Sequence, residues 1–244
     1  MRVIAIIPAR LNSKRFPRKL IEKINGIPLI VMTYQNLLSM DIFDKIIVAT
    51  DSLEISNIIK KHGGEVFISK KEHFCGSDRV SEASSNFKSD IVINVQGDEP
   101  FVKPRNIKKI INFFKDKQNI NIPVVSLIYE TNDTEIINDE NCVKVVTDKN
   151  NFAMYFSRSK IPFLRNIDKS FNFYIHVGVY GFLSQSIIHF SSLKPSKLEK
   201  IEMLECIRFI ENGQKIKMIR IDHPTIGIDT PNDLIEAKKY LESI

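Results

Sequence analysis

Two carboxylates stand side by side in the segment QGDEP, residues 96–100, directly after an apolar run that reads as a buried strand. Pro100 keeps that strand from continuing, so Asp98 falls beyond its end. A hard cation could bridge Asp98 and phosphate oxygens there, because magnesium commonly takes one or two carboxylates and completes its shell with substrate oxygens and water. A turn or helix-capping role for Asp98 is the alternative. Asp229, in GIDTPNDL, is a second candidate of the same kind, and a structural cap again competes.

A basic segment follows the first apolar run. The sequence IPARLNSKRFPRK, residues 7–19, carries five cations: Arg10, Lys14, Arg15, Arg18 and Lys19. It lacks the glycines of a P-loop or of a G-x-G-x-x-G turn, so any phosphate binding must come from side chains. Arg10, Arg15 and Lys19 could clamp triphosphate oxygens, since Arg forks bind phosphates bidentately. A solvated basic loop is the alternative.

The segment HFCGSDR, residues 73–79, places Gly76 and Ser77 before a predicted helix, where the backbone could approach a base. Arg79 falls in the first turn of that helix, where the macrodipole disfavours a cation. We therefore expect a partner or a ligand for Arg79, a surface position being the alternative.

Polar residues also interrupt apolar patterns in the second half. In IEMLECIRFIENG, Glu202 and Glu205 are three residues apart and share one face of a predicted helix. In IHVGVYGF, His176 and Tyr180 fall on one side of a predicted strand, although a structural role for the histidine competes. Arg158, in YFSRSKIP, could bind a carboxylate or form a surface ion pair.

Apolar runs alternate with helical patterns in the first half, and these elements must position the motifs. We predict strands over residues 3–7, 45–49, 65–68 and 91–95 and helices over residues 28–40, 51–61, 77–87 and 104–115. Near-continuous apolar strands alternating with helices predict an α/β fold, a parallel sheet with helices on both faces. Ligands of such sheets bind beyond the carboxyl ends of the strands, so the basic segment and QGDEP should open on the same edge.

The second half is more mixed. We predict strands over residues 124–130, 142–147, 173–182 and 216–221 and a helix over residues 197–212. Gly213 should end that helix, Thr230 and Pro231 should begin the last one, and Asp51 should cap the helix over residues 51–61. No linker rich in Gly and Ser separates the halves, so we predict a single domain over residues 1–244 with an inserted subregion around residues 120–215.

Composition excludes several classes of protein. The chain has 244 residues, 43% hydrophobic residues and a net charge of +6, with the basic residues too dispersed to indicate nucleic-acid binding. Every apolar run is too short for membrane insertion, and the N-terminal run is too short for the core of a signal peptide, so we expect a cytoplasmic protein. Cys75, Cys142 and Cys206 form no C-x-x-C pair, which favours free thiols over zinc or disulfides.

The order of the motifs is more specific than any one of them. Together IPARLNSKRFPRK, HFCGSDR, NVQGDEP, CVKVV, YFSRSKIP, HVGVYGF, PSKLEKIEMLECIRFIENG and GIDTPNDL closely resemble the 3-deoxy-manno-octulosonate cytidylyltransferases, the CMP-Kdo synthetases. The resemblance spans nearly the whole chain and implies a Rossmann-like nucleotide-diphospho-sugar transferase fold with a mostly parallel mixed sheet, in a homodimer. It implies CMP transfer from CTP to Kdo with Mg²⁺, giving CMP-Kdo for lipopolysaccharide and pyrophosphate.

The resemblance also assigns roles to residues. Catalysis would involve Arg10, Lys19, Asp98 and Asp229, of which Asp98 and Asp229 would hold the metal. The nucleotide would contact Ala9, Arg10, Ser13, Arg15, Lys19, Ser77 and Arg79. The sugar acid would contact Gln96, Arg158, His176, Tyr180 and Glu205. The subregion around residues 120–215 would serve sugar binding and dimerisation.

Three departures from the family pattern concern the sugar and the loop. Arg18 stands where the family usually has Gly, Cys75 and Ser77 replace a usual Ser and Thr, and Phe182 replaces a usual Tyr. A cytidylyltransferase for 8-amino-Kdo or a sialic-type acid is therefore an alternative. A catalytically silent protein that binds nucleotides or nucleic acid through its basic surface is another, and it predicts no pyrophosphate release.

Overall fold

The computed structural model describes residues 1–12, 16–119, 121–166, 171–222 and 226–242. Within these residues, nine strands form one sheet: β1 (Val3–Ala9), β4 (Lys45–Thr50), β5 (Glu65–Ile68), β6 (Ile91–Val95), β7 (Val124–Thr131), β8 (Lys144–Thr147), β9 (Ala153–Ser157), β10 (Phe173–Leu183) and β11 (Ile216–Arg220). The short strands β2 (Lys23–Ile24) and β3 (Ile27–Pro28) form a separate hairpin.

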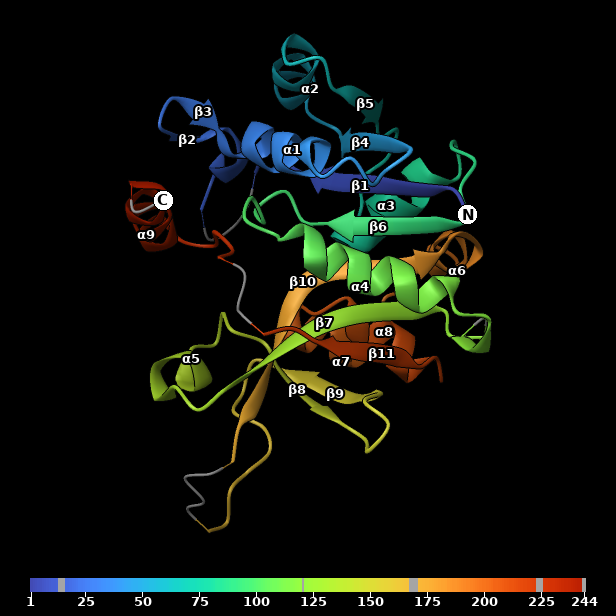
Figure 1. Cartoon of the computed structure of the whole chain (residues 1–244), viewed down its shortest axis with the longest axis vertical. Helices are drawn as coiled ribbons and strands as arrows, with labels where there is room; N and C mark the ends of the chain where they lie inside the picture. The colour runs from blue at the N-terminus through green and yellow to red at the C-terminus, as the bar shows by residue number, and fades with distance from the viewer. Residues whose placement is uncertain (13–15, 120, 167–170, 223–225, 243–244) are drawn as a thin grey trace.

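The sheet is mixed and mostly parallel along its main path. Its order is β11-β7-β10-β6-β1-β4-β5, with β8 and β9 branching from β10. Strands β6, β1, β4 and β5 run parallel, whereas β10 runs antiparallel to both β6 and β7. In Figure 1, β8, β9 and the lower end of β10 project away from the main sheet. The predicted fold class is confirmed.

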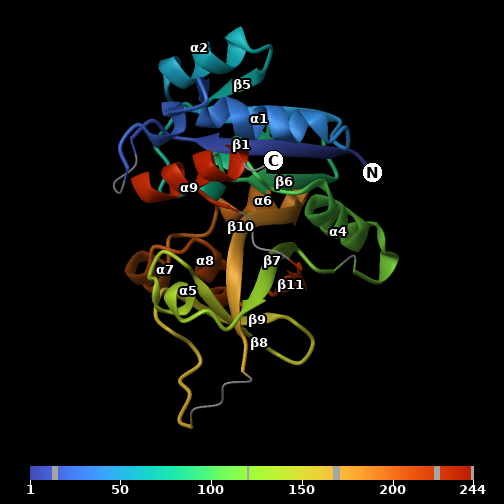
Figure 2. The same cartoon turned by 60° about the vertical axis from the view of Figure 1, so that its left-hand side comes forward.

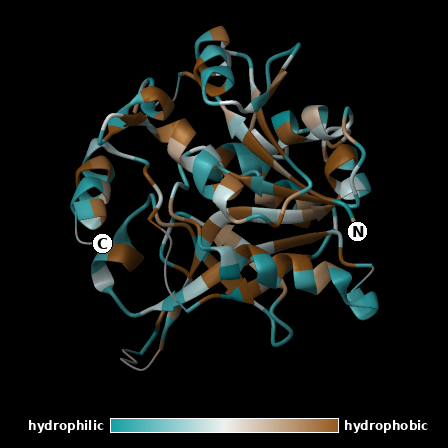
Figure 3. Cartoon of the chain, turned by 45° about the horizontal axis from the view of Figure 1, so that its top comes forward, coloured by the Kyte–Doolittle hydropathy of each residue, from teal (hydrophilic) through white to brown (hydrophobic). Residues whose placement is uncertain are grey.

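Helices cover both faces of the sheet, as Figures 1 and 2 show. The helices are α1 (Leu29–Ser39), α2 (Leu53–Lys61), α3 (Gly76–Ser84), α4 (Pro104–Lys115), α5 (Thr134–Asn138), α6 (Ser184–Phe190), α7 (Lys197–Glu202), α8 (Cys206–Glu211) and α9 (Pro231–Glu242), with the 3-10 turns η1 (Lys19–Ile21) and η2 (Lys117–Asn119). One buried apolar cluster contains residues of α1, α2 and α4, and a second contains residues of α3, α6 and α8. Figure 3 shows the hydrophobic colour along the central strands, between these two layers.

Local signals explain why several elements begin where they do. Pro104 occupies the first turn of α4, where its missing N–H leaves no helical bond unmade. At the start of α9 the Thr230 hydroxyl accepts the Asp233 N–H, and the Asp233 carboxylate accepts the Thr230 N–H at 2.7 Å. This reciprocal cap confirms the predicted start of the last helix.

Two predictions about helices are wrong. The helix predicted over residues 197–212 is two helices, because Met203 adopts a left-handed conformation between α7 and α8. Gly213 does follow α8 with a positive φ of 73°. Asp51 does not cap α2: the Ser52 hydroxyl accepts the Ile55 N–H instead. Strand β9 and helices α5 and α6 were not predicted.

Candidate active site

A cavity of about 780 Å³ opens at the carboxyl ends of β1 and β6 and extends to β10 and α7–α8. Eleven of the predicted site residues line it: Ala9, Arg10, Lys19, Arg79, Gln96, Asp98, Arg158, His176, Tyr180, Glu205 and Asp229. Ser77 lies behind this wall and bonds to Glu205. Ser13 and Arg15 lie outside the described residues. A smaller hollow of about 380 Å³ along β8 and β10 contains none of the predicted residues.

Lys19, Asp98 and Asp229 form what we term the lysine–carboxylate cluster. The Lys19 ammonium lies 2.5 Å from the Asp98 carboxylate and 3.1 Å from that of Asp229. Burial by itself would lower the pKa of Lys19, but the charges and hydrogen bonds of the two carboxylates outweigh it and raise the pKa above its ordinary value. The two carboxylates therefore converge on one ammonium group, whose protonated form they stabilise.

Tight packing between loops holds the lysine–carboxylate cluster in place. A Cβ atom at Gly97 would lie only 3.1 Å from the Leu20 side chain, so glycine lets η1 approach the loop that follows β6. The Thr33 hydroxyl donates to the Gly97 carbonyl at 2.8 Å and fixes the same loop from α1. The Ile228 N–H donates to the Asp98 carbonyl at 3.0 Å, which ties the two carboxylate-bearing loops together.

The start of α3 is held by Glu205, which is distant in the chain. The Glu205 carboxylate accepts hydrogen bonds from the Ser77 N–H, at 3.1 Å, and from the Ser77 hydroxyl. Cys75, at the N-cap position of α3, makes no capping bond with its own side chain. Glu205 therefore satisfies the helix start, where the macrodipole favours a negative charge, while it also lines the cavity.

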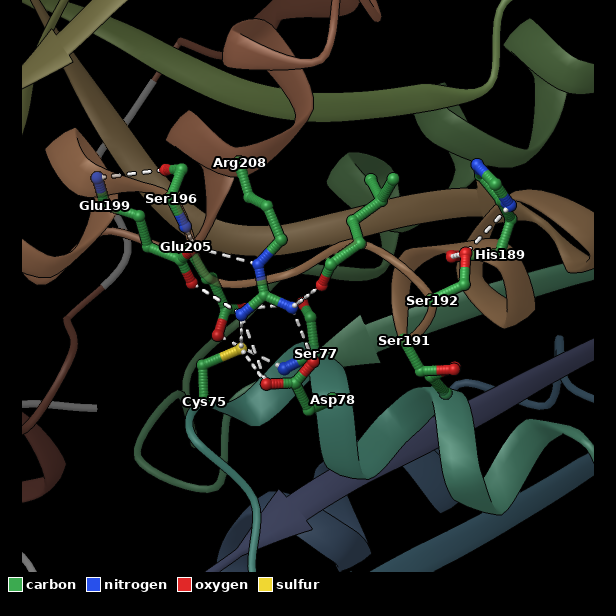
Figure 4. A network of polar contacts seen from close by, with 12 residues as sticks. Cys75, Ser77, Asp78, His189, Ser191, Ser192, Ser196, Glu199, Glu205 and Arg208 are labelled. Carbon is green, nitrogen blue, oxygen red and sulfur yellow. Dashed lines mark hydrogen bonds and ion pairs between the residues drawn. The ribbon is translucent and has the colours of Figure 1, made fainter.

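A buried arginine lies directly behind this corner of the cavity (Figure 4). The Arg208 guanidinium, 1% exposed, donates two hydrogen bonds to Glu199, at 2.6 and 2.8 Å, and two to Asp78, at 2.7 and 3.2 Å. It also lies 4.1 Å from the centre of the Phe190 ring. Glu199 belongs to the capping box of α7. Arg208 thus joins α6, α7 and α8 to the first turn of α3.

Arg79 has the partner that its unfavourable position predicted. Its guanidinium donates to the Asp51 carboxylate at 2.8 Å and contacts the Ser69 hydroxyl at 3.4 Å. Burial alone would raise the pKa of Asp51, but the hydrogen bond and charge of Arg79 lower it below the ordinary value. Arg79 is held against the cavity wall by these contacts.

His176 and Tyr180 lie together, with ring centroids 5.2 Å apart, as the strand pattern predicted. Burial lowers the pKa of His176 to about 3, so the imidazole is neutral at pH 7, and its Nε2 lies 2.8 Å from the Ser126 hydroxyl. Burial raises the pKa of Tyr180 well above its ordinary value, so its phenol stays protonated. Both groups are therefore uncharged at the cavity wall, and the Tyr180 hydroxyl also bonds to the Cys206 side chain.

Glu202 and Glu205 do not share a helix face, because the break at Met203 separates them. The Glu202 carboxylate accepts the Ser157 hydroxyl at 2.7 Å and the Arg158 N–H at 2.9 Å. The Arg158 side chain donates to the backbone carbonyls of Glu202 and Glu140. Two backbone carbonyls therefore hold the Arg158 guanidinium at the cavity. The Glu202 carboxylate bonds to Arg158 only at the backbone N–H.

Glu99 lines the cavity but was not among the predicted site residues. Its carboxylate lies where Cβ atoms at Gly227 and Gly178 would meet it, at 3.2 and 3.5 Å. The two glycines leave room for it between β10 and the loop before α9. The sequence could have indicated Glu99 as a cavity residue, because it is adjacent to Asp98 and follows the same buried strand.

The donor set suits a metal that brings other ligands with it. Within the described ranges, no three Asp, Glu, His or Cys side chains gather into a metal-binding group. The carboxylates of Asp98 and Asp229 nonetheless face the same position, because both contact the Lys19 ammonium. Two carboxylates fit magnesium, which often completes its coordination with water and substrate phosphates.

Known proteins resemble this chain along its whole length. Residues 4–216 match the family model described as Cytidylyltransferase. The chain is 43% identical over 240 residues to the 3-deoxy-manno-octulosonate cytidylyltransferase of Christiangramia forsetii, covering 98% of this chain and 97% of that protein. It is 43% identical over 244 residues to the protein of the same name from Flavobacterium johnsoniae, covering 100% of both.

Solved structures agree with the sequence relatives. A CMP-2-keto-3-deoxy-manno-octonic acid synthetase complexed with CTP matches with a TM-score of 0.90 and 30% identity, covering 100% of this chain and 99% of that one. A 4-diphosphocytidyl-2C-methyl-D-erythritol synthase from Anaerococcus prevotii matches with a TM-score of 0.65 and 17% identity, over 99% and 98% of the two chains, which shows a shared fold. No helix of the described residues is long and apolar enough to cross a membrane.

Proposed function

The chain belongs to the 3-deoxy-manno-octulosonate cytidylyltransferases, a family of nucleotidyltransferases, and we propose that it transfers CMP from CTP to Kdo. The products would be CMP-Kdo, for lipopolysaccharide assembly, and pyrophosphate. The observation that carries the proposal is one cavity containing the lysine–carboxylate cluster together with Arg158, His176 and Glu205. Such a cavity can hold a triphosphate and a polyhydroxylated acid side by side.

The nucleotide would lie over the ends of β1 and β6. Arg10 and Lys19 would neutralise the β- and γ-phosphates, with Ser13 and Arg15 assigned to the same role by the resemblance. The base and ribose would lie near Ala9 and the start of α3, where Ser77 and Arg79 are held by protein contacts. Cations that contact the phosphates stabilise the charge that develops on a transferring phosphoryl group.

The sugar acid would lie toward β10 and α7–α8, within the subregion around residues 120–215. Arg158 suits the carboxylate of the acid, because its guanidinium is oriented by two carbonyls. Neutral His176 and Tyr180 suit hydroxyls as partners, and so do Gln96 and Glu205. The contact between Glu205 and Ser77 would join the two substrate ends.

In the reaction, the anomeric hydroxyl oxygen of the sugar bonds to the α-phosphorus of CTP, and the bond to the bridging oxygen of pyrophosphate breaks. The hydroxyl proton leaves to solvent, and no protein nucleophile is needed. Asp98 and Asp229 would hold Mg²⁺, which supplies charge neutralisation at the triphosphate. The protein's own contribution is to align the hydroxyl with the phosphorus and to exclude competing orientations.

We further propose that the protein acts as a homodimer in the cytoplasm. Met154 in β9 and Phe163 in the loop after it are 61% and 87% exposed, and a partner subunit would cover them in the proposed dimer. Cys75, Cys142 and Cys206 are free thiols, as expected in a reducing compartment. Light scattering after size-exclusion chromatography would test the dimer, and Phe163→Asp should weaken it.

Acceptor specificity tests the proposed function directly. CTP and Mg²⁺ are incubated with Kdo, 8-amino-Kdo or N-acetylneuraminate, and pyrophosphate is measured. Release with Kdo at a kcat/KM well above that of the other acids supports the proposal. Preferential release with another acid keeps the mechanism and replaces the substrate. Silence with all three acids, from folded protein that binds CTP, favours a binding protein instead.

A further inference from the structure

We propose that Lys19 is a displaceable cation of the metal site. In the free protein it holds Asp98 and Asp229 together, and it leaves this place when a metal-bound triphosphate arrives. The inference rests on the proposed function, because it concerns the metal and the nucleotide of the same site. It adds a condition that the proposed function does not contain, namely that metal binding depends on the nucleotide.

The geometry shows one cation serving two carboxylates. The Lys19 ammonium contacts Asp98 at 2.5 Å and Asp229 at 3.1 Å, and its side chain is 7% exposed. The two carboxylates are more open, at 27% and 36% exposure. Lys19 is thus the least exposed of the three side chains, although all three line the cavity, from which the carboxylates can be approached.

Electrostatics explains why a cation is needed before any metal is present. Two partly buried carboxylates that face one point repel each other, and removing the cation of a buried pair leaves charges without compensation. Lys19 provides that compensation in the free protein. An ammonium and a divalent cation cannot both occupy the point, because they would repel each other there.

A metal ion alone therefore gains little by displacing Lys19. It would exchange part of its tightly held water for two carboxylates and would leave the ammonium without partners. A metal ion that arrives with a triphosphate brings phosphate oxygens as further ligands. The same phosphates give Lys19 new partners within reach of its flexible four-carbon stem. The displacement is favourable only when metal and nucleotide arrive together.

The test compares wild type with Lys19→Met, which keeps an unbranched side chain and removes the charge. Binding of Mn²⁺ alone is measured from the electron paramagnetic resonance signal of the free ion. Binding of CTP in the presence of Mn²⁺ is measured by calorimetry. Since a charge-assisted hydrogen bond corresponds to roughly tenfold or more in an equilibrium, the variant should bind Mn²⁺ alone roughly tenfold more tightly and CTP roughly tenfold more weakly.

Lys23→Met is the matched control, because Lys23 is exposed in β2 and the variant carries the same change of charge. It should bind both ligands as wild type does. Changes of opposite sign in Lys19→Met distinguish displacement from partial unfolding, which would weaken both ligands. The proposal is overturned if Lys19→Met binds Mn²⁺ no more tightly than wild type does. If CTP binding still needs Mn²⁺ in that case, the proposed metal site stands without the displacement of Lys19.

Wild type offers a second measurement that does not depend on a variant. Thermal unfolding is followed with Mn²⁺ alone, CTP alone and both together. The proposal expects a higher Tm only with both ligands. If Mn²⁺ alone raised the Tm as much as Mn²⁺ and CTP together, the proposal would be contradicted. CTP binding unaffected by Mn²⁺ in every protein would remove the metal from the proposed function and this inference with it.

Discussion

Glu205 accepts two hydrogen bonds from Ser77, although 128 residues separate them in the chain. The contact joins the start of α3 to the start of α8, two segments that both contribute residues to the cavity lining. Its backbone component satisfies a helix N-terminus, and its carboxylate lines the cavity. In the proposed site, the Glu205 side chain therefore links the region assigned to the nucleotide with the region assigned to the sugar acid.

Glu205→Gln should weaken binding of the sugar acid. The amide keeps an acceptor for Ser77 but loses the charge, and a hydrogen bond to a charged group contributes about 1.5–3 kcal/mol. We expect the KM for Kdo to rise roughly tenfold or more on that scale, with a smaller change in the KM for CTP. Steady-state pyrophosphate assays measure both constants. Glu211→Gln, exposed at the end of α8, should leave them unchanged. Equal effects in the two variants would contradict the assignment.

Arg208→Met should destabilise the fold strongly. The substitution leaves Glu199 and Asp78 facing each other without the guanidinium, and breaking a buried pair on one side costs about 3–5 kcal/mol. Urea unfolding measures the loss of free energy. Arg220→Met is the matched control, since Arg220 forms a 2.7 Å ion pair with Glu130 at the surface. An exposed pair contributes about 0–1 kcal/mol. Similar losses in the two variants would show that burial does not matter here.

Stability should fall as pH falls below about 6.5, the ordinary pKa of the His176 imidazole. Burial holds its pKa in the folded protein at about 3, so between these values the unfolded state binds a proton that the folded state does not. His176 then contributes a slope of up to about 1.4 kcal/mol per pH unit. Urea unfolding from pH 7 to pH 4 should show a shallower slope in His176→Gln. In exposed His62→Gln the wild-type slope should persist.

Arg18→Gly should be tolerated although it breaks a 2.6 Å ion pair with Glu54. Arg18 has φ 60° and ψ 14°, a left-handed conformation that glycine adopts more readily than any other residue. The left-handed conformation costs a non-glycine residue about 1–2 kcal/mol. We expect Arg18→Gly to be about 1 kcal/mol more stable than Arg18→Ala, which keeps the strain and also loses the pair. Chemical denaturation of both variants checks this, and a less stable glycine variant would contradict it.

The sequence predicted the sheet well because parallel strands buried on both faces read as continuous apolar runs. The strand over residues 91–95, buried along its whole length, was predicted with the observed bounds. So was the strand over residues 65–68, although it is a partly exposed edge strand. The sequence also predicted that the basic segment and QGDEP open on the same edge of the sheet, which holds because β1 and β6 are parallel neighbours. The direct contact between Lys19 and Asp98 was not predicted. Asp229 was placed there by family resemblance.

The predictions failed where a contact distant in the chain decides the local structure. Nothing in the apolar pattern marks the left-handed residue Met203, so one helix was predicted where α7 and α8 diverge. Asp51 looked like a helix cap, but Arg79 takes its carboxylate and Ser52 caps α2 instead. Arg208 fits an ordinary helix pattern, and only the fold shows that it is buried between two carboxylates.

The most direct test of the central claim is pyrophosphate release from CTP, Mg²⁺ and Kdo by wild type, Asp98→Asn and Asp229→Asn. Asp222→Asn is the control, because Asp222 is 68% exposed. We predict release by wild type and the control, and a loss of about a hundredfold or more in kcat in the other two variants, the scale expected when a group that stabilises transition-state charge is removed. Wild-type protein that releases no pyrophosphate, or Asp98→Asn and Asp229→Asn variants as active as the control, would contradict the account.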